Sequence, residues 1–219
     1  MTHNKTISAA GAAAALLLAA GPPAFASVDE GVSTAGVYFW ADPETSVGDS
    51  TLRRTDHGVV ASFAAGSIEP SSAITLWWVV FNEPEHCSAP GCGEDDIFVG
   101  GDLAADLNAD GVAAADIVSG YAAGTLAAPD GTVYLSAALA EGDLGTDLIL
   151  GEGALLKNAP GAEIHLVARS HGPAIGGLED VQTTSFAGGC ETMLLPPEVP
   201  DAEGECANLQ YSLHPAVTP

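Results

Sequence analysis

The chain has 219 residues with 29 acidic and 5 basic side chains, which gives a formal net charge of −24. A phosphate backbone is bound by clustered Lys and Arg, and only Arg53 and Arg54 stand together, so nucleic acid is excluded as a partner. The same shortage of basic residues argues against an anionic membrane surface. Hydrophobic residues make up 47% of the chain, which is enough for a core and argues against disorder.

The first 26 residues have the pattern of a secretory signal peptide. Lys5 supplies a positive charge, Ala9 to Ala20 form an apolar stretch, and Ala24-Phe25-Ala26 fits the small-x-small cleavage rule with a cut before Ser27. An uncleaved membrane anchor is the alternative, but the stretch is shorter than the about 20 residues that a spanning helix needs. We therefore predict a secreted protein, or one on the exterior of the cell envelope, that does not insert into a membrane after cleavage.

The cysteines are even in number and suit an oxidising compartment. Of the three possible pairings, we favour the two local ones, because each would close a Gly/Pro-rich loop between strand-like segments: Cys87–Cys92 and Cys190–Cys206. A four-thiolate zinc site is the alternative, but it normally uses two C-x2-C pairs and the spacings here are longer.

Strand-like runs recur about every 10 residues with turn signals between them, which predicts an all-β fold, an antiparallel sandwich or barrel. We divide the chain into the signal peptide, an N-terminal segment at 27–49 and a single β domain at 50–219, with a short helical or loop insertion at about 100–116. Leu103–Leu107 and Ala113–Ile117 are its helical candidates. The predicted strands are Gly36–Trp40, Ser50–Arg54, Gly58–Ala64, Ala73–Asn82, Ile117–Ala128, Thr132–Ala140, Ala162–Arg169, Gln182–Phe186 and Asn208–His214.

Two local patterns sharpen this prediction. The run from Ile74 to Phe81 is apolar on both faces, which is typical of a central strand covered on both sides, and its Trp77 and Trp78 are then core residues rather than a stacking platform. Between two later runs, Pro129-Asp130-Gly131 predicts a tight turn, because Pro presets φ and Gly accepts a positive φ.

Several short motifs are spread over residues 50–214. They are Leu52-Arg53-Arg54-Thr55 with Gly58-Val59-Val60, Leu76-Trp77-Trp78-Val79-Val80-Phe81-Asn82-Glu83-Pro84-Glu85 with Cys87 and Cys92-Gly93, Ala162-Glu163-Ile164-His165-Leu166-Val167 with Ser170-His171-Gly172-Pro173, and Gly188-Gly189-Cys190 with Cys206 and His214. Together they resemble an uncharacterised family of secreted bacterial β-sandwich proteins, which carries no established activity. More remotely, Ile164-His165 with its Gly-rich sequel is similar to the His-bearing strand of chordin-type (CHRD) domains. Relative to the family pattern, Asp102–Asp116 looks like an insertion.

The sharpest local motif is Asp106-Leu107-Asn108-Ala109-Asp110-Gly111, which matches the opening of an EF-hand-like calcium loop. Calcium prefers oxygen ligands, here from Asp106, Asn108 and Asp110, and the Gly allows the sharp turn. The twelfth position falls on Ile117 and the nearest acid is Asp116, one residue early, so we expect a weak extracellular-type site. An Asx-rich surface turn is the alternative, and Glu94-Asp95-Asp96 is read as a solvated charge run rather than a source of further ligands.

The histidines offer a second candidate metal site. His165 and His214 would meet if their strands were neighbours, with His171 or His86 as a third nitrogen ligand, and three imidazoles suit zinc or copper. Against this, the chain has no H-x-H or H-E-x-x-H spacing, and a His on a polar strand face is more often a hydrogen-bonded structural residue.

Signs of catalysis are weaker still. Ser170 and His171 are adjacent, and neighbours on a strand point to opposite faces, while a G-x-S-x-G elbow is lacking. The sequence therefore favours a non-enzymatic extracellular protein with a binding or structural role, possible calcium stabilisation and an unknown extracellular ligand or protein as partner. A copper- or zinc-dependent enzyme or metal-binding protein using His165, His171 and His214 is the alternative.

Overall fold

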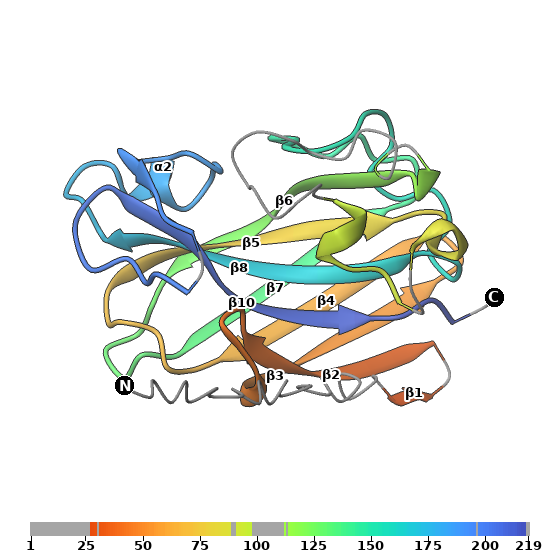
Figure 1. The fold of residues 1–219 in the computed structure, drawn as a ribbon, viewed down its shortest axis with the longest axis horizontal. Coiled ribbons are helices and arrows are strands. Elements are labelled where there is room, and N and C mark those ends of the chain that lie inside the picture. Colours follow the sequence, from red (N-terminus) through yellow and green to blue (C-terminus); the bar gives the residue numbers. More distant parts are fainter. Residues whose placement is uncertain are drawn as a thin grey trace, which may run out of the picture.

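The computed structural model describes residues 27–29, 31–88, 91–97, 112, 114–195 and 197–217. Its strands form one sheet in the order β6-β5-β8-β10-β2-β3-β4-β7, in which neighbours run antiparallel, with β1 added beside β2 and a short parallel β9 beside β10 (Figure 1). The strands are β1 (Ser27–Asp29), β2 (Val32–Phe39), β3 (Asp42–Thr55), β4 (Gly58–Ala65), β5 (Ser72–Phe81), β6 (Ile117–Leu126), β7 (Val133–Ala140), β8 (Glu163–Pro173), β9 (Thr192–Met193) and β10 (Glu205–His214).

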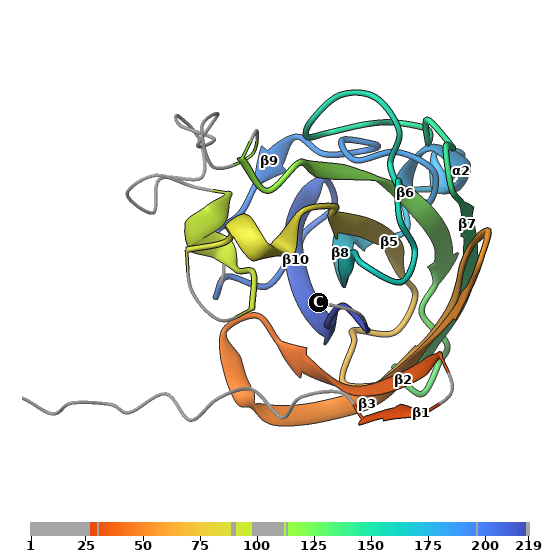
Figure 2. The same cartoon turned by 90° about the vertical axis from the view of Figure 1, so that its right-hand side faces the viewer.

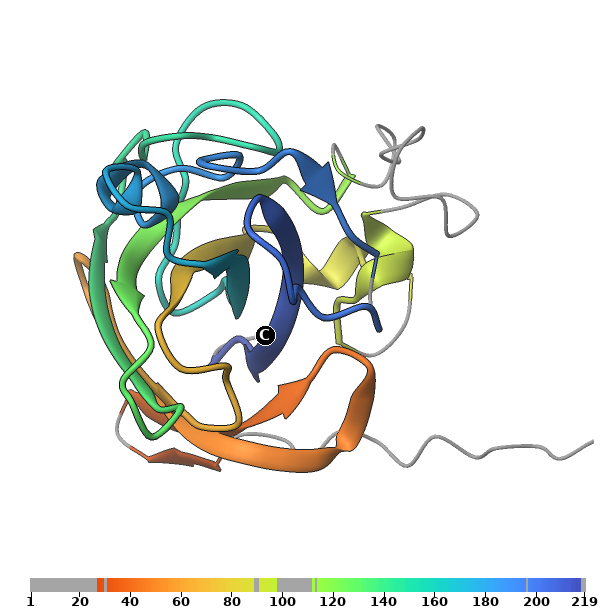
Figure 3. The same cartoon turned by 90° about the vertical axis from the view of Figure 1, so that its left-hand side faces the viewer.

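The sheet curls into a nearly closed barrel. Its two end strands, β6 and β7, lie side by side when the molecule is viewed along the barrel (Figures 2 and 3). The predicted Pro129-Asp130-Gly131 turn joins them: Gly131 donates its N–H to Ala128 and has a φ of 76°, which glycine accepts without strain. The all-β, barrel-like prediction is thus confirmed.

Eight of the nine predicted strands are present in the structure, with ends that differ by up to eight residues. The remaining predicted strand, Gln182–Phe186, is wrong, because α2 (Glu179–Gln182) ends there in a turn. The side chains explain the difference: Thr183 and Thr184 donate their hydroxyls to main-chain oxygens of Glu179 and Asp180, which favours a helical turn over a strand.

The segment at 27–49, which the sequence set apart from the β domain, contributes β1, β2 and the first half of β3 to the same sheet. Of the predicted helices, Leu103–Leu107 lies outside the described residues. In the second candidate Ala114 is helical, but Ile117 is already the first residue of β6. Two short 3-10 helices, η1 (Pro84–His86) and η2 (Glu94–Asp96), flank the first disulfide.

Side chains from all around the barrel fill its interior. In β5 the even-numbered residues from Ile74 to Val80 point inward, and they meet Ile164 and Leu166 of β8 and Phe63 of β4. The odd-numbered Trp77 lies on the outer face of β5, where it is only 1% exposed because Tyr121 and Phe186 cover it. The prediction of a central strand covered on both sides is confirmed, and so is the burial of both tryptophans.

Both predicted disulfides are present: Cys87–Cys92 and Cys190–Cys206. They lie near opposite ends of β8: Cys92 donates its N–H to Glu163 at the start of the strand, and Cys190 Sγ lies 3.5 Å from the ring of His171 near its end. Each one fixes a loop against the outer face of the sheet. A four-thiolate zinc site is therefore not formed in this structure.

Candidate functional site

The three histidines proposed as a metal site do not converge. Strands β8 and β10 are neighbours, as the hypothesis required, but His214 pairs with Ile164 while His165 pairs with Leu213. Because facing residues in a ladder share a side, His214 points into the barrel and His165 points outward. The predicted meeting of His165 and His214 is wrong.

His214 is completely buried in a polar part of the barrel interior. Its Nδ1 lies 2.8 Å from Ser33 Oγ and its Nε2 lies 2.9 Å from Ser50 Oγ, so both ring nitrogens have hydroxyl partners. Burial, with a smaller contribution from the positive charge of Arg54, lowers the pKa of His214 to about 3. The ring is therefore neutral at neutral pH, and its nitrogens are occupied.

His165 lies at the other face of the sheet, under the first disulfide loop. Its Nε2 is 2.8 Å from Glu163 Oε1, and the same carboxylate oxygen accepts the N–H of Cys92. Phe81 covers the ring, with the centroids 4.7 Å apart. Glu163 and His165 thus anchor the loop to the start of β8.

His171 lies near the opposite end of β8, and its environment is different. Nε2 is 2.9 Å from Thr75 Oγ1, and Nδ1 is 2.8 Å from the carbonyl oxygen of Gly188. Since only a protonated Nδ1 can donate to a carbonyl, Nε2 accepts the hydroxyl of Thr75. Burial, with a smaller contribution from Arg169, lowers the pKa of His171 to about 4 despite the favourable bond to Gly188. Nδ1 also lies beside the second disulfide, 3.5 Å from Cys190 Sγ and 3.6 Å from Cys206 Sγ.

Of the predicted calcium ligands, only Asp116 lies among the described residues, and calcium binding stays a prediction. Asp106, Asn108 and Asp110 lie outside the described residues, whereas Asp116 just precedes β6. Both carboxylate oxygens of Asp116 accept hydrogen bonds from Lys157 Nζ, at 2.7 and 2.6 Å. In this structure, therefore, the carboxylate of Asp116 is paired with a lysine.

The two other candidate ligand groups are held by local contacts. Asp96 accepts the N–H groups of Ser88 and Gly93, so within Glu94-Asp95-Asp96 this side chain closes the first disulfide loop. His86 contacts Glu83 and the carbonyl oxygen of Ala114, and among the described residues it belongs to no group of three potential metal ligands.

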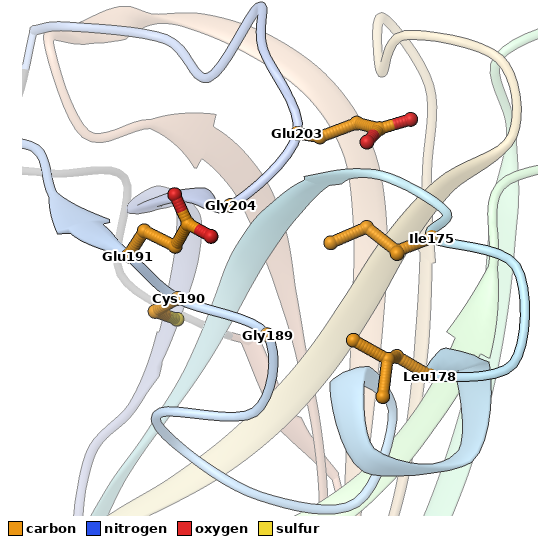
Figure 4. Close-up of a pocket in the computed structure, with 7 residues that line it drawn as sticks. All are labelled: Ile175, Leu178, Gly189, Cys190, Glu191, Glu203 and Gly204. Carbon is orange, nitrogen blue, oxygen red and sulfur yellow. The ribbon is translucent and has the colours of Figure 1, made fainter.

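A pocket of about 420 Å³ lies beside the second disulfide, where the end of β8 meets α2 and the loop before β10. Ile175 and Leu178 form an apolar wall, Glu191 lies across the pocket from them, and Glu203 lies above Ile175 (Figure 4). Gly189, Cys190 and Gly204 complete the lining. A concave site with an apolar wall and a few polar groups is the usual form of a small-molecule site.

The sequence builds this pocket from turns that require glycine. Gly189 and Gly204 have φ values of 73° and 79°, and a Cβ on Gly188 would overlap the carbonyl oxygen of Val181. Gln182 of α2 fixes the pocket wall, since its amide group accepts the N–H of Ile175 and donates to the carbonyl oxygens of His171 and Pro173. The disulfide Cys190–Cys206 then ties the loop to β10.

The pocket residues Glu191, Glu203, Ile175 and Leu178 carry no sequence motif that identifies them. A partial signal was present, because Met193–Glu205 was recognisable as an acidic, Pro-rich loop closed by Cys190 and Cys206. The apolar wall comes from a segment that precedes this loop by more than ten residues, and no local pattern connects the two.

Comparisons of the chain with protein-family models, curated proteins and solved structures found no match. The resemblance to a family of secreted bacterial proteins and to chordin-type domains therefore stays a prediction. Among the residues that the structure describes, no helix is long and apolar enough to cross a membrane.

Proposed function

We propose that this chain is an exported, non-enzymatic binding protein whose pocket takes a small organic cation with an apolar part, such as an alkylammonium ion. The observation that carries the proposal is the lining of the pocket itself, in which the carboxylates of Glu191 and Glu203 are combined with the apolar side chains of Ile175 and Leu178. Carboxylates would bind the charged group, while the apolar wall would cover the hydrocarbon.

Size and charge support this ligand class. The pocket volume of about 420 Å³ lies within the range of about 300–1,000 Å³ that small-molecule sites occupy. The net charge of −24 attracts cations and repels anions over distances of about 8–10 Å at moderate salt. The loop is also tied down by a disulfide, so little conformational entropy is lost when a ligand binds.

Export is supported by two features of the chain. Residues 1–26 have the pattern of a signal peptide, and the four cysteines form two disulfides, as in proteins of oxidising compartments. A calcium-stabilising role for Asp106, Asn108 and Asp110 remains part of the proposal, and a thermal unfolding curve with and without EDTA tests it: an unchanged midpoint would remove it.

The ligand proposal is tested by titrating the purified protein with hexylammonium and with hexanol at constant ionic strength, using calorimetry. We expect the ammonium compound to bind and the alcohol, which has the same chain without the charge, to bind at least about tenfold more weakly. The double variant Glu191→Gln/Glu203→Gln should weaken hexylammonium binding by about tenfold or more.

The matched control removes two charges elsewhere. Glu152 and Glu198 are exposed and do not line the pocket, so Glu152→Gln/Glu198→Gln should bind as the wild type does. Equal weakening by both double variants would mean that the ammonium ion responds only to the overall charge, and the pocket would lose its assignment.

A further inference from the structure

Three atoms that can bind a metal ion gather where β8, β10 and the pocket loop meet. His171 Nδ1 lies 3.5 Å from Cys190 Sγ and 3.6 Å from Cys206 Sγ, and the three atoms lie within 4.8 Å of one another. In the structure the two sulfurs are joined as a disulfide, so neither is a thiolate. The histidine therefore lies beside two sulfur atoms that could become thiolates if the disulfide were reduced.

We propose that reduction of the Cys190–Cys206 disulfide converts this cluster into a binding site for a thiophilic divalent ion such as Zn²⁺, with His171, Cys190 and Cys206 as ligands. With a phosphine reductant, the phosphorus lone pair breaks the S–S bond. The phosphine leaves as its oxide with the oxygen of one water molecule, and the two protons of that water end on the two sulfurs. The metal ion then displaces both thiol protons to solution.

The distances fit this ion with little rearrangement. Zinc–sulfur and zinc–nitrogen bonds of about 2.3 and 2.0–2.1 Å make the N–S edge of a tetrahedral site about 3.5–3.6 Å. The two N–S distances in the structure are 3.5 and 3.6 Å. The two sulfurs have to separate to about 3.8 Å, which is the S–S edge of the same tetrahedron. The carbonyl oxygen of Gly188, 2.8 Å from Nδ1, has to give way to the metal ion.

The elements that carry the ligands can provide this movement. Continuing the β8–β10 register by one step from Ser170–Ala207 places Cys206 directly opposite His171, so these two ligands sit on paired strands. Cys190 comes from the loop after Gly188-Gly189 and is the ligand that is free to move once the S–S bond is broken. A site with two fixed ligands and one adjustable ligand needs no change in the barrel.

The hydrogen bonds of His171 differ between the two ring tautomers: the bond to Gly188 requires a proton on Nδ1, whereas Thr75 can pair with either form of Nε2. Nδ1 donates to the carbonyl oxygen of Gly188 in the disulfide form, and a metal ion requires this nitrogen to lose its proton. The proton then lies on Nε2, which is 2.9 Å from Thr75 Oγ1 and can donate to it. Thr75 also accepts the indole N–H of Trp77 at 2.7 Å, which holds the hydroxyl in place. Such a partner behind a metal-binding histidine fixes its orientation.

The fourth coordination position would be open toward the pocket. Cys190 and Glu191 both line the pocket, and the carboxylate of Glu191 points into it (Figure 4). Three protein ligands with one open position are typical of zinc sites that exchange water or a ligand. The metal site does not require the alkylammonium proposal, because its three ligands belong to the disulfide and to β8.

The first disulfide provides an internal comparison. Cys87 and Cys92 also lie near a third potential ligand, Asp96, but the two oxygens of that carboxylate already accept the N–H groups of Ser88 and Gly93. We therefore expect the reduced Cys87–Cys92 pair to bind the metal ion much more weakly.

The test uses the complete mature chain, from Ser27 onward, with Cys87→Ser/Cys92→Ser. The protein is reduced with a phosphine and titrated with Co²⁺, whose visible and near-ultraviolet absorption reports tetrahedral thiolate coordination. We expect a single equivalent to bind, absorption lost on adding Zn²⁺, and no such signal from the unreduced protein. The matched variant Cys190→Ser/Cys206→Ser should show only hydrated octahedral cobalt.

His171→Asn in the Cys87→Ser/Cys92→Ser background should weaken binding by at least about tenfold. A second readout needs no further substitution, because X-ray absorption of the zinc-loaded protein should show two sulfur neighbours and an imidazole. The proposal would be overturned if the reduced protein showed two titratable thiols but no cobalt–thiolate charge-transfer band. A spectrum with sulfur and no imidazole, or loss of the native circular dichroism spectrum on reduction, would also overturn it, since the site needs β8 and β10 to stay paired.

Discussion

Two buried histidines, His171 and His214, show how similar chemistry can have different prospects for function. Burial lowers the pKa of both rings, to about 4 and about 3. His214 faces the barrel interior and its nitrogens contact the hydroxyls of Ser33 and Ser50. His171 faces outward, beside a disulfide that lines a pocket.

This comparison shows that burial alone lowers the pKa of a histidine, so a lowered pKa does not by itself identify a functional residue. Around His214 the partners are side chains of β2 and β3, and the ring stands at 0% exposure within the described barrel, so its network can only hold strands together. The ring of His171 is buried to the same extent, but Cys190 of the neighbouring disulfide lines a pocket that a ligand can reach. Access therefore separates the candidate site from the structural network.

The largest expected effect comes from removing the guanidinium that organises the interior network. Arg54 is 7% exposed and donates to the carbonyl oxygens of Ala159, Ala162, His214 and Pro215. Arg54→Met leaves these carbonyls without their donor, and we expect the free energy of unfolding in urea to fall by about 3–5 kcal/mol. Pocket binding per folded molecule should not change.

The neighbouring arginine provides the control. Arg53 is exposed on the outer face of β3, so Arg53→Met should change the free energy of unfolding by no more than about 0.5 kcal/mol. Equal losses in the two variants would show that the interior network does not depend on Arg54.

These arginines also show how much the sequence could predict. Strands, the Pro129-Asp130-Gly131 turn and both disulfides follow from local signals, namely alternation, turn residues and cysteine spacing. That Arg54 lies inside and Arg53 outside depends on which face of β3 closes the barrel. This is a property of the whole sheet, and no local pattern contains it.

The face of β10 was harder to predict for the same reason. Gln210, Ser212 and His214 form a polar set that alternation alone assigns to solvent, but all three are buried inside the barrel. His214 can lie inside because Ser33, Ser50 and Arg54 supply its partners, and the amide nitrogen of Gln210 donates to the carbonyl oxygen of Gly66. The pocket likewise joins segments that are distant in sequence, so its residues could not be identified from spacing.

An intermediate effect is expected from pH. The pKa of His214 is near 6.5 in the unfolded chain and about 3 in the folded protein. As pH falls below 6.5, the unfolded chain binds a proton that the folded protein does not bind, so the free energy of unfolding decreases until pH reaches about 3. Between pH 7 and 5, His214 should cost about 2 kcal/mol of the free energy of unfolding. His214→Asn should therefore lose about 2 kcal/mol less than the wild type over this interval in urea titrations.

His57, exposed in the turn between β3 and β4, is the matched control for this measurement. His57→Asn removes an exposed imidazole in place of the buried one, so a change of slope seen only in His214→Asn is caused by the interior ring. Identical slopes for the wild type and His214→Asn would mean that folding does not lower the pKa of the interior ring, and the contrast with His171 would then rest on access alone.

The smallest effect tests how completely the interior network is satisfied. Ser212 Oγ is buried and has no hydrogen-bond partner among the residues that the structure describes, whereas Ser33 Oγ lies 2.8 Å from His214 Nδ1. Replacing an unpaired buried hydroxyl with a methyl group removes a desolvation cost, so Ser212→Ala should leave stability unchanged or raise it by up to about 1 kcal/mol. Ser33→Ala should instead lower it by about 1–2 kcal/mol, because it leaves an imidazole nitrogen without its partner. If Ser212→Ala destabilised the protein as much as Ser33→Ala does, Ser212 would have to hold an internal water, and the interior would be a hydrated network rather than a dry one.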